Sequence, residues 1–313
     1  MPELPEVTVI TQQLDKKLRG LVLESIEYDW PKKFYWGEFS ITDLRGMVVK
    51  SVERQGKVVL INLQRLSGNQ VIRLSGKKNP GSQKARQPEN LTILIHLKLT
   101  GQLIYQDAKT RIAGGHPIPP LNLPVPNKTT RATLTFKGGG RLYFNDVRKF
   151  GWVKVVESEE SKVKSAIGTA LGPDPLVMSY EEFRERIRKR AQSRIKKLLM
   201  DQSFIAGVGN IYSDEALWRA KIHPKRSVIS LKPLEVRKLY DGICESLKLA
   251  IEKGGSSANA YVDSGGEKGL YLSFAKAYHM TGKPCARCKT PIVREKMDGR
   301  SAHFCPHCQR IQK

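Results

Sequence analysis

The first six residues of the chain could supply a nucleophile and a proton donor. They read MPELPE, and Met1 is expected to be removed because the second residue is small. Pro2 would then carry a free secondary amine, which can attack an electrophilic sugar carbon and form an iminium, as lysine amines do elsewhere. Glu3 could transfer the proton that opening of the sugar ring requires. A proline followed by a glutamate also occurs at helix starts that have no catalytic role. The rest of the sequence must therefore distinguish the two interpretations.

A second candidate site is the segment 207–210, GVGN, which precedes an expected helix start. Gly207 and Gly209 have no side chains and permit another group to approach the backbone closely. The first amides of a helix are free and bind phosphate well. Asn210 could add a side-chain donor to the same site.

Four of the five cysteines follow the pattern C-x2-C-x16-C-x2-C. Each Cys-x2-Cys knuckle can direct two thiolates at one ion, and two knuckles complete a tetrahedral Zn²⁺ site. A shell of four thiolates leaves no position for a substrate, so we expect one structural zinc ion. Two disulfides would need an oxidising compartment, for which no signal peptide is visible. The expected ligands are Cys285, Cys288, Cys305 and Cys308.

Three further residues with reactive side chains are expected to be structural. His303 and His307 lie within the cysteine module, and we expect them on its surface because four thiolates already suffice. Cys244 falls in an amphipathic segment and is expected to be a small apolar core residue.

The net charge of the chain predicts a polyanionic partner. The 313 residues include 54 Lys and Arg against 30 Asp and Glu, which gives a formal charge of +24. A membrane surface fits less well, because the basic residues do not follow a long amphipathic segment. No apolar run reaches the roughly 18 residues of a membrane-spanning helix. We therefore expect a cytoplasmic protein that binds nucleic acid and no membrane.

The first half of the chain is predicted to be β-structure behind one helix. Apolar residues at positions 7, 10, 14 and 18 predict a helix over Glu6–Leu18. An all-β sandwich or barrel fits the short apolar runs that follow. Arg65–Asn90 is basic and Gly114–Asn127 is rich in proline, so both are expected to be loops. The predicted strands are Val48–Val52, Val58–Leu63, Leu91–Leu97, Ala132–Phe136, Arg141–Phe144 and Gly151–Val156.

The second half is predicted to be helical. Helices are expected over Tyr180–Met200, Ile211–Ala220 and Pro233–Lys253, and Gly254–Gly269 is expected to be a loop. The chain is thus predicted to be a multidomain α+β protein. Its expected parts are a catalytic domain at 1–156, a linker at 157–172, a helical domain at 173–265 and a C-terminal region with the finger at 266–313.

In these motifs and their order, the chain resembles formamidopyrimidine-DNA glycosylase, a bacterial base excision repair enzyme that removes oxidised purines. The resemblance covers nearly the whole chain, from the Pro-Glu start through the segment 200–212 to the four-cysteine finger. It implies an N-terminal β-sandwich with an opening helix, a helix–two-turn–helix domain and a zinc finger. It also implies that damaged duplex DNA is the partner, and that a monomer acts at the nucleoid.

The resemblance assigns the reaction to a few positions. Pro2 matches the nucleophile and Glu3 the general acid, and Glu6 matches a residue that supports the site. Lys57 matches a lysine that contacts DNA and the lesion region, and Arg300 matches the arginine of the zinc finger. The implied reaction is excision of the base followed by β- and δ-elimination from a Schiff base, without any cofactor except zinc.

The resemblance also implies DNA contacts. Flipping of a base leaves a void in the duplex that protein side chains must fill. Arg148 matches an arginine that faces the orphaned cytosine, and Phe150 matches a wedge. Leu99 takes the place of a methionine of similar size. The other expected DNA-binding residues are His96, Asn210 and Lys196.

Some residues depart from the purine enzymes. Lys98 and Leu99 are closer to the sister family, endonuclease VIII, which excises oxidised pyrimidines, whereas Arg148 and Phe150 favour purines. The segment Gly254–Leu272 could hold a lesion-covering loop, although its sequence is not close to that loop. Two alternatives therefore stay open: an endonuclease VIII-like glycosylase, and a non-catalytic zinc-containing DNA-binding protein.

Overall fold

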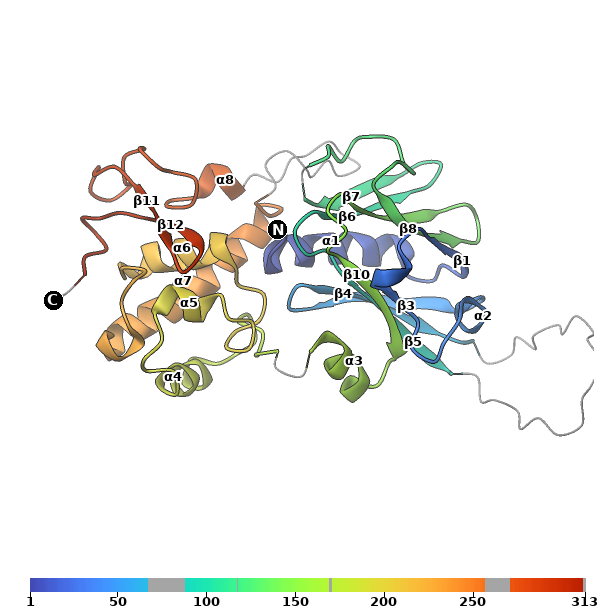
Figure 1. The fold of residues 1–313 in the computed structure, drawn as a ribbon, viewed down its shortest axis with the longest axis horizontal. Coiled ribbons are helices and arrows are strands. Elements are labelled where there is room, and N and C mark those ends of the chain that lie inside the picture. Colours follow the sequence, from blue (N-terminus) through green and yellow to red (C-terminus); the bar gives the residue numbers. More distant parts are fainter. Residues whose placement is uncertain (67–87, 117, 169–170, 257–270, 312–313) are drawn as a thin grey trace, which may run out of the picture.

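The computed structural model of the chain describes residues 1–66, 88–116, 118–168, 171–256 and 271–311. A β-sandwich and a helical body lie side by side, and the N-terminus lies at their junction (Figure 1). From there helix α1 (Leu4–Leu18) runs into the sandwich. The zinc-finger region lies on the helical body, away from the sandwich.

Two five-stranded sheets form the sandwich, in the orders β1-β8-β9-β6-β7 and β2-β10-β5-β4-β3. Neighbouring strands are antiparallel except for the short β2, which runs parallel to β10. The prediction of an N-terminal β-sandwich is confirmed. The bounds are β1 Leu23–Tyr28, β2 Phe34–Tyr35, β3 Val48–Gln55, β4 Val58–Gln64, β5 Asn90–His96, β6 Gly101–Gln106, β7 Arg111–Gly115, β8 Thr130–Phe136, β9 Arg141–Asp146 and β10 Trp152–Glu157.

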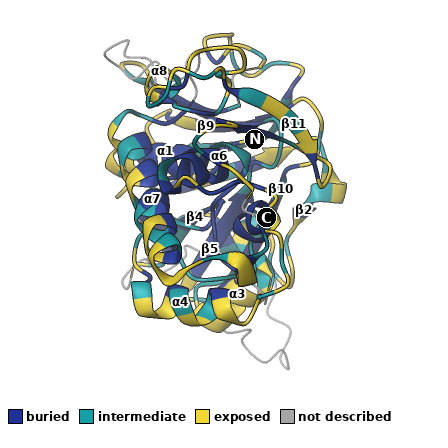
Figure 2. Ribbon diagram, turned by 90° about the vertical axis from the view of Figure 1, so that its left-hand side faces the viewer, coloured by how far each residue is buried: buried dark blue, intermediate teal, exposed yellow. Residues whose placement is uncertain are grey.

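Helix α1 packs into both halves of the molecule. Val7, Ile10 and Leu14 belong to the core between the two sheets, as their helical spacing predicted. Leu4, at the first turn, packs instead with Val208 in the core of the helical body. Figure 2 shows this buried interior in dark blue, with β4 and β5 inside and the faces of α3 and α4 exposed. The start of α1 is therefore fixed by both domains.

The remaining helices follow the predicted order with two differences. The predicted helices at 211–220 and 233–253 are confirmed, whereas the segment predicted as a linker contains α3. Val163 of α3 packs with Leu60 and Leu94 on the outer face of the second sheet. The bounds are α2 Ile41–Leu44, α3 Glu160–Ile167, α4 Tyr180–Arg188, α5 Ile195–Leu199, α6 Asn210–Ala220, α7 Pro233–Glu252 and α8 Tyr271–Phe274, with 3-10 turns η1 Pro31–Lys33 and η2 Val228–Ser230.

The prediction of one helix over Tyr180–Met200 is wrong, because the chain leaves the helix between α4 and α5. Backbone pairing to a distant segment replaces the helical hydrogen bonds there. The Ile195 amide donates to Arg226 O over 2.9 Å, and the Val228 amide donates to Ser193 O over 2.9 Å. Tertiary contacts thus override a local pattern of helix-forming residues.

The C-terminal finger is a hairpin of β11 (Val293–Met297) and β12 (Arg300–Phe304). Most of the predicted loops at 65–90 and 254–269 lie outside the described residues. Within the described part of the chain, no helix is both long and apolar enough to cross a membrane.

Candidate active site and DNA interface

The start of α1 is held against the loop that precedes α6. The Leu4 amide donates to Gly207 O over 3.0 Å, and Pro2 beside it is buried. The Glu3 amide donates to Glu6 Oε2 over 2.8 Å, which caps the first turn of α1. The first residues of the chain are thereby fixed at the junction of the two domains.

The Glu3 carboxylate lies at the N-terminus of α6. Its Oε1 accepts from the Ile211 amide over 3.0 Å, and its Oε2 accepts from the Tyr212 amide over 3.4 Å. The side chain is only 2 % exposed. Burial raises the pKa of Glu3; Lys57 opposes this rise and Glu6 adds to it. Glu3 therefore keeps its proton to a higher pH than an ordinary glutamate, as a general acid must.

Gly207 and Gly209 make room for the chain's own N-terminus. Gly207 has a φ of +87°, and a Cβ there would lie 2.6 Å from Leu4 Cβ. A Cβ on Gly209 would lie 2.3 Å from Glu3 Cδ. The prediction that these glycines open the first amides of α6 to phosphate is therefore corrected: two of those amides bind the Glu3 carboxylate. Asn210 is half-buried, and within the described chain its Oδ1 has no hydrogen-bond partner.

Glu6 connects three parts of the chain. Its carboxylate accepts from the Tyr212 hydroxyl over 2.6 Å and from the Ser256 amide over 2.7 Å. A Cβ on Gly255 would lie 3.2 Å from Glu6 Oε1, so the segment after α7 also approaches closely. Glu6 thus positions the start of α1 against α6 and the end of α7.

Lys57 approaches the same site from the turn between β3 and β4. Its side chain is 7 % exposed, and Nζ donates to Val208 O over 3.0 Å. Burial lowers the pKa of Lys57, whereas the negative charges of Glu3 and Glu6 raise it. The ammonium group therefore lies within electrostatic reach of both carboxylates.

The amino group of the chain belongs to the same cluster. In the described chain it is the amine of Met1, and burial lowers the pKa of this amine from its ordinary value. Glu3 and Glu6 oppose this change, while Lys57 and Arg300 lower the pKa further. An amine with a lowered pKa is more often neutral, and therefore nucleophilic, near pH 7. The structure thus brings together all five residues expected around the reaction: Pro2, Glu3, Glu6, Lys57 and Arg300.

Two neighbouring loops emerge from the sandwich beside this site. Gly101 of β6 is paired with Asp146 of β9, so the loops before β6 and after β9 leave the sheet together. Asp146 joins them, because its carboxylate accepts from the Thr100 hydroxyl and, over 2.7 Å, from the Gly151 amide. The two loops therefore form one unit.

This pair of loops carries the three expected wedge residues. Leu99 is half-buried in the first loop, whereas Arg148 and Phe150 are exposed in the second. The Arg148 guanidinium lies 4.9 Å from the centre of the Phe150 ring, a cation–π contact. The structure thus places the three side chains on adjacent loops and leaves Phe150 46 % exposed.

His96 ends β5 close to these loops. Its Nδ1 accepts from the Lys98 amide over 2.9 Å, which leaves the proton of a neutral ring on Nε2. Burial, assisted by Lys98 and Lys57, lowers the pKa of His96 to about 3. The ring is therefore neutral at pH 7 and can donate one hydrogen bond from Nε2, for example to a phosphate.

Lys196 lies inside the protein rather than on its surface. Its ammonium group pairs with Asp214 of α6 and donates to Ser301 O over 2.9 Å. Asp214 also accepts from the His303 amide over 3.0 Å and lies 2.9 Å from His303 Nδ1. The expected surface position of His303 is therefore wrong, and the position of Lys196 favours fixing the finger to α6 over a phosphate contact. His307 is exposed, as predicted.

Several residues that position the site were not predicted from the sequence, among them Asp146, Tyr212 and Asp214. Glu215 also belongs to this group, because its buried carboxylate accepts from the amides of residues 276–278. The available signal was a pair of acids inside an otherwise apolar helix, since acidic residues are buried only when they are paired. Their partners are not local: Asp214 pairs with Lys196, 18 residues away, and with His303, 89 residues away, and the partners of Glu215 lie more than 60 residues away, so the sequence does not identify them.

The four predicted zinc ligands come together in the finger. Their sulfur atoms all lie within 4.8 Å of one another, which fits a tetrahedral ion with Zn–S bonds of about 2.3 Å. Four thiolates fill the coordination shell, so the zinc is structural. Cys285 and Cys305 pack against Trp218 of α6, and the metal site therefore also fixes the finger to the helical body.

A groove of about 730 Å³ separates the finger hairpin from the segment before and within α5. Basic side chains dominate its lining, which suits a phosphate backbone. A hollow of about 850 Å³ at the other end of the sandwich is lined by acidic residues such as Glu53 and Glu157, and its charge would repel DNA. The basic residues of the groove are Arg190, Arg194, Lys196, Lys197 and Arg300.

Comparison with known families agrees with this arrangement. The N-terminal domain of formamidopyrimidine-DNA glycosylase matches residues 1–153, and the H2TH domain of the same family matches residues 171–262. A zinc finger found in FPG and IleRS matches residues 282–311.

Curated relatives and solved structures cover the chain from end to end. Formamidopyrimidine-DNA glycosylase from Pelotomaculum thermopropionicum is 35 % identical and covers all of both chains, and that from Enterococcus faecalis is 34 % identical, covering 100 % of this chain and 98 % of its own. Lactococcus lactis Fpg in complex with abasic-site DNA is 29 % identical with a TM-score of 0.78, and MutM in complex with carbocyclic 8-oxo-G DNA is 30 % identical with a TM-score of 0.77. Both matches cover 99 % of this chain and 100 % of the other. The chain belongs to the formamidopyrimidine-DNA glycosylase family.

Proposed function

We propose that this protein excises oxidised purines from duplex DNA and then cleaves the abasic site, with Pro2 as the nucleophile. The observation that carries the proposal is the burial of Pro2 and Glu3 at the junction of the two domains, beside Lys57. The relatives with abasic-site and 8-oxo-G DNA support the substrate class. A protein that only binds DNA would need neither a buried acid nor an amine at this place.

The reaction starts at the Pro2 nitrogen once Met1 has been removed. Its lone pair attacks C1′ of the damaged nucleotide as Glu3 protonates O4′, so the bond from C1′ to O4′ breaks and the sugar opens while the base is still attached. The nitrogen then loses its proton, and its lone pair forms the iminium with C1′ as the bond from C1′ to the base breaks and the base leaves with the electron pair. Burial lowers the pKa of the Met1 amine at this place. We expect the same for the Pro2 amine once Met1 is removed, so Pro2 needs no separate base.

Glu3 supplies the proton that opens the sugar. Its carboxyl group is fixed by the amides of Ile211 and Tyr212, so its position does not depend on side-chain flexibility. Transfer of its proton to O4′ breaks the bond between O4′ and C1′ and leaves Glu3 ionised. Lys57 then stabilises the carboxylate that forms.

The two eliminations follow from the iminium. It acidifies the hydrogens on C2′, and loss of one of them expels the 3′ phosphate; a second elimination expels the 5′ phosphate. Lys57 and Arg300 both act electrostatically on the amino group at this site and can stabilise the departing phosphates. Zinc holds the finger that presents Arg300 and takes no part in these steps.

The wedge residues and the groove support binding of a flipped nucleotide. Leu99, Arg148 and Phe150 would enter the void that the base leaves, and the basic groove would hold the backbone. All of these side chains come from one chain, which supports a monomer. We place the protein in the cytoplasm, at the nucleoid, because its substrate is there.

A glycosylase for oxidised pyrimidines is the second candidate, favoured by Lys98 and Leu99. The test compares single-turnover excision of 8-oxoguanine opposite cytosine with excision of an oxidised pyrimidine opposite its normal partner. We expect the purine to be excised faster, because Arg148 is exposed and can face the cytosine. Faster excision of the pyrimidine would assign the protein to the second candidate.

Borohydride reduction tests the nucleophile. It should trap a covalent adduct on the N-terminal tryptic peptide that ends at Lys16. The buried Lys57 is the competing amine, and an adduct on the peptide that contains Lys57 would contradict the assignment to Pro2. The absence of any adduct would favour a non-catalytic DNA-binding protein.

A further inference from the structure

Three lysines on the sandwich are not explained by the reaction or by the wedge. Lys33 ends η1, Lys98 follows β5, and Lys154 lies in β10. The register brings them together, because β2 and β5 flank β10, with Tyr35 opposite Lys154 and His96 opposite Trp152. We call Lys33, Lys98 and Lys154 the lysine shelf.

The shelf is held in place by aromatic rings. Lys154 Nζ lies 4.8 Å from the Trp152 ring and 5.7 Å from the Tyr35 ring, and it donates to Ala166 O over 2.7 Å. The rings fix the lysine without neutralising its charge. The ammonium group of Lys154 is therefore positioned before any ligand arrives.

Lys98 has an unusual backbone conformation for a residue with a side chain. Its φ is +49°, in the region where glycine is preferred. Burial lowers the pKa of Lys98, and the positive charges of Lys33 and Lys154 lower it further. A lysine that is strained and repelled in this way gains from an anion that neutralises the cluster.

No carboxylate of the protein fulfils this role in the described part of the chain. The ion pairs found there include none of the three lysines. Asp146, the acid of the nearby loops, already binds Thr100 and Gly151. Among the described residues the cluster therefore keeps a net positive charge, which an external anion would balance.

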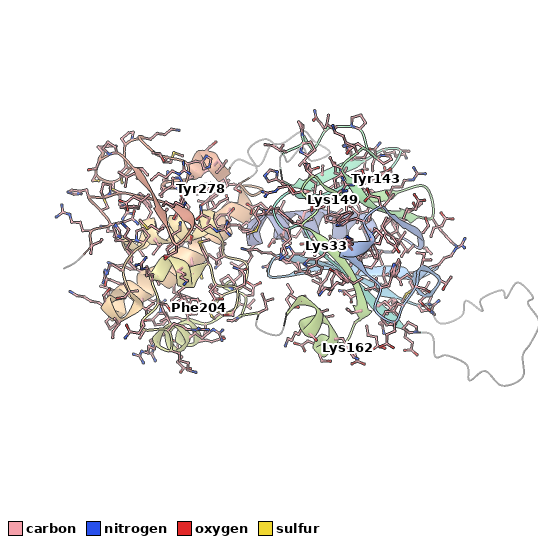
Figure 3. All side chains as sticks on the ribbon, in the orientation of Figure 1. Lys33, Tyr143, Lys149, Lys162, Phe204 and Tyr278 are labelled. Carbon is pink, nitrogen blue, oxygen red and sulfur yellow. The ribbon has the colours of Figure 1, made fainter. Side chains whose placement is uncertain are left out.

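The shelf is continuous with the wedge loops. Lys98 directly precedes Leu99, and Lys33 lines the same small pocket as Lys149, which follows Arg148. Figure 3 labels Lys33 and Lys149 near each other on the sandwich. A duplex seated on the wedge would place its next phosphates over this surface.

We propose that the lysine shelf is a phosphate-binding site that holds the DNA backbone beyond the wedge. This inference rests on the proposed function, because the wedge fixes where the duplex lies. The shelf recognises closely spaced phosphates rather than bases, and it extends the interface without touching the reacting sugar.

The test measures the salt dependence of binding to undamaged duplex. The variant Lys33→Gln/Lys98→Gly/Lys154→Gln removes three charges, and the glycine suits the backbone at position 98. If each lysine neutralises one phosphate, the slope of log Kd against log salt should decrease by about 0.9 for each phosphate that the variant no longer neutralises. The control Lys50→Gln/Lys109→Gln/Lys137→Gln removes the same charge from exposed positions at the other end of the sandwich.

The salt slopes and the trapping yields distinguish a role of the lysine shelf in DNA binding from a role in the reaction. Equal slopes for the shelf variant and the control would overturn the proposal. Because Lys154 also bonds to Ala166, the double variant Lys33→Gln/Lys98→Gly is measured as well, and it should show about two thirds of the effect of the triple variant. Trapping by borohydride at saturating DNA should stay unchanged in both variants, and its loss would contradict a site outside the chemistry.

Neutral backbone linkages locate the phosphates that the shelf binds. Methylphosphonates are placed one at a time along each strand beyond the lesion. Some of them should weaken binding of the unaltered protein severalfold and leave the shelf variant unaffected. If every position weakens both proteins equally, the shelf does not contact phosphate.

Discussion

At the scale of single residues, the site depends on a carboxyl group that is buried and accepts two backbone hydrogen bonds. The Glu3 carboxyl group accepts hydrogen bonds from two amides of α6. Burial raises the pKa of Glu3 by more than the charge of Lys57 lowers it. The same burial lowers the pKa of the neighbouring amine. One environment therefore favours the neutral form of both groups, which is the form that each needs in order to react.

Replacement of Glu3 by glutamine tests the acid. Glu3→Gln keeps the volume of the side chain but cannot donate the proton, so base excision should slow by about 10²–10⁴-fold. Trapping on a preformed abasic site should fall much less, because part of that sugar is already open. Single-turnover excision and borohydride trapping measure the two steps, with Glu245→Gln on the surface of α7 as the control. Equal losses in both assays would contradict an acid role.

The pH dependence gives an independent test at the same residue. Because its pKa is raised, Glu3 is protonated below that pKa and ionised above it, so base excision should decline as pH rises past it. The rate on 8-oxoguanine duplex is measured from pH 5 to 9. The decline should be absent from the residual activity of Glu3→Gln; a decline that persists there belongs to another group.

At the scale of elements, α6 organises the active site and the finger. The Ile211 amide at its N-terminus donates to Glu3. Asp214 in its second turn binds Lys196 of α5 and His303 of the finger. A change of position in α6 would therefore move the general acid and the zinc finger together. The buried carboxylate of Asp214 thus joins α5 and the finger to α6.

Removal of the charge on Asp214 should therefore be costly. Asp214→Asn leaves the buried Lys196 without its counter-ion, and we expect a loss of about 3–5 kcal/mol in the free energy of unfolding. Urea denaturation measures it. The exposed pair between Lys225 and Glu295 provides the control, since Glu295→Gln should cost at most about 1 kcal/mol. Similar values for the two variants would show that Asp214 does not anchor the finger.

Local patterns predicted most elements, but not those made by distant contacts. The spacing of apolar residues was sufficient for α1 and α7, because each presents one continuous apolar face. It failed at 189–194, where backbone pairing with residues 226–228 ends the helix. Strands β6 and β7 were missed because glycine and polar residues interrupt their apolar pattern.

At the scale of the whole molecule, one chain combines a charged surface with a site that depends on both domains. The charge of +24 predicted a polyanionic partner, and the cysteine spacing predicted the zinc site. The order of motifs predicted the family. The contacts from Glu3 to Ile211 and from Glu6 to Ser256 could not be predicted, because more than 200 residues separate the partners.

Removal of zinc should weaken DNA binding without unfolding the sandwich. The finger has a small core of its own and relies on the metal, whereas the sandwich has a large core between its sheets. After chelation we expect weaker binding to duplex by gel shift and an unchanged main unfolding transition. DNA binding that is indifferent to a chelator, with zinc loss verified, would reject this role of the finger.

The central claim is that the Pro2 nitrogen performs the reaction, and retention of Met1 tests it most directly. Protein produced with methionine aminopeptidase inhibited keeps Met1, and later treatment with that enzyme exposes Pro2 in an otherwise identical chain. Intact mass verifies each form before borohydride trapping on abasic-site duplex. We expect almost no adduct before treatment, because the Pro2 nitrogen is then an amide, and a strong adduct afterwards. Equal trapping of the two forms would contradict the account.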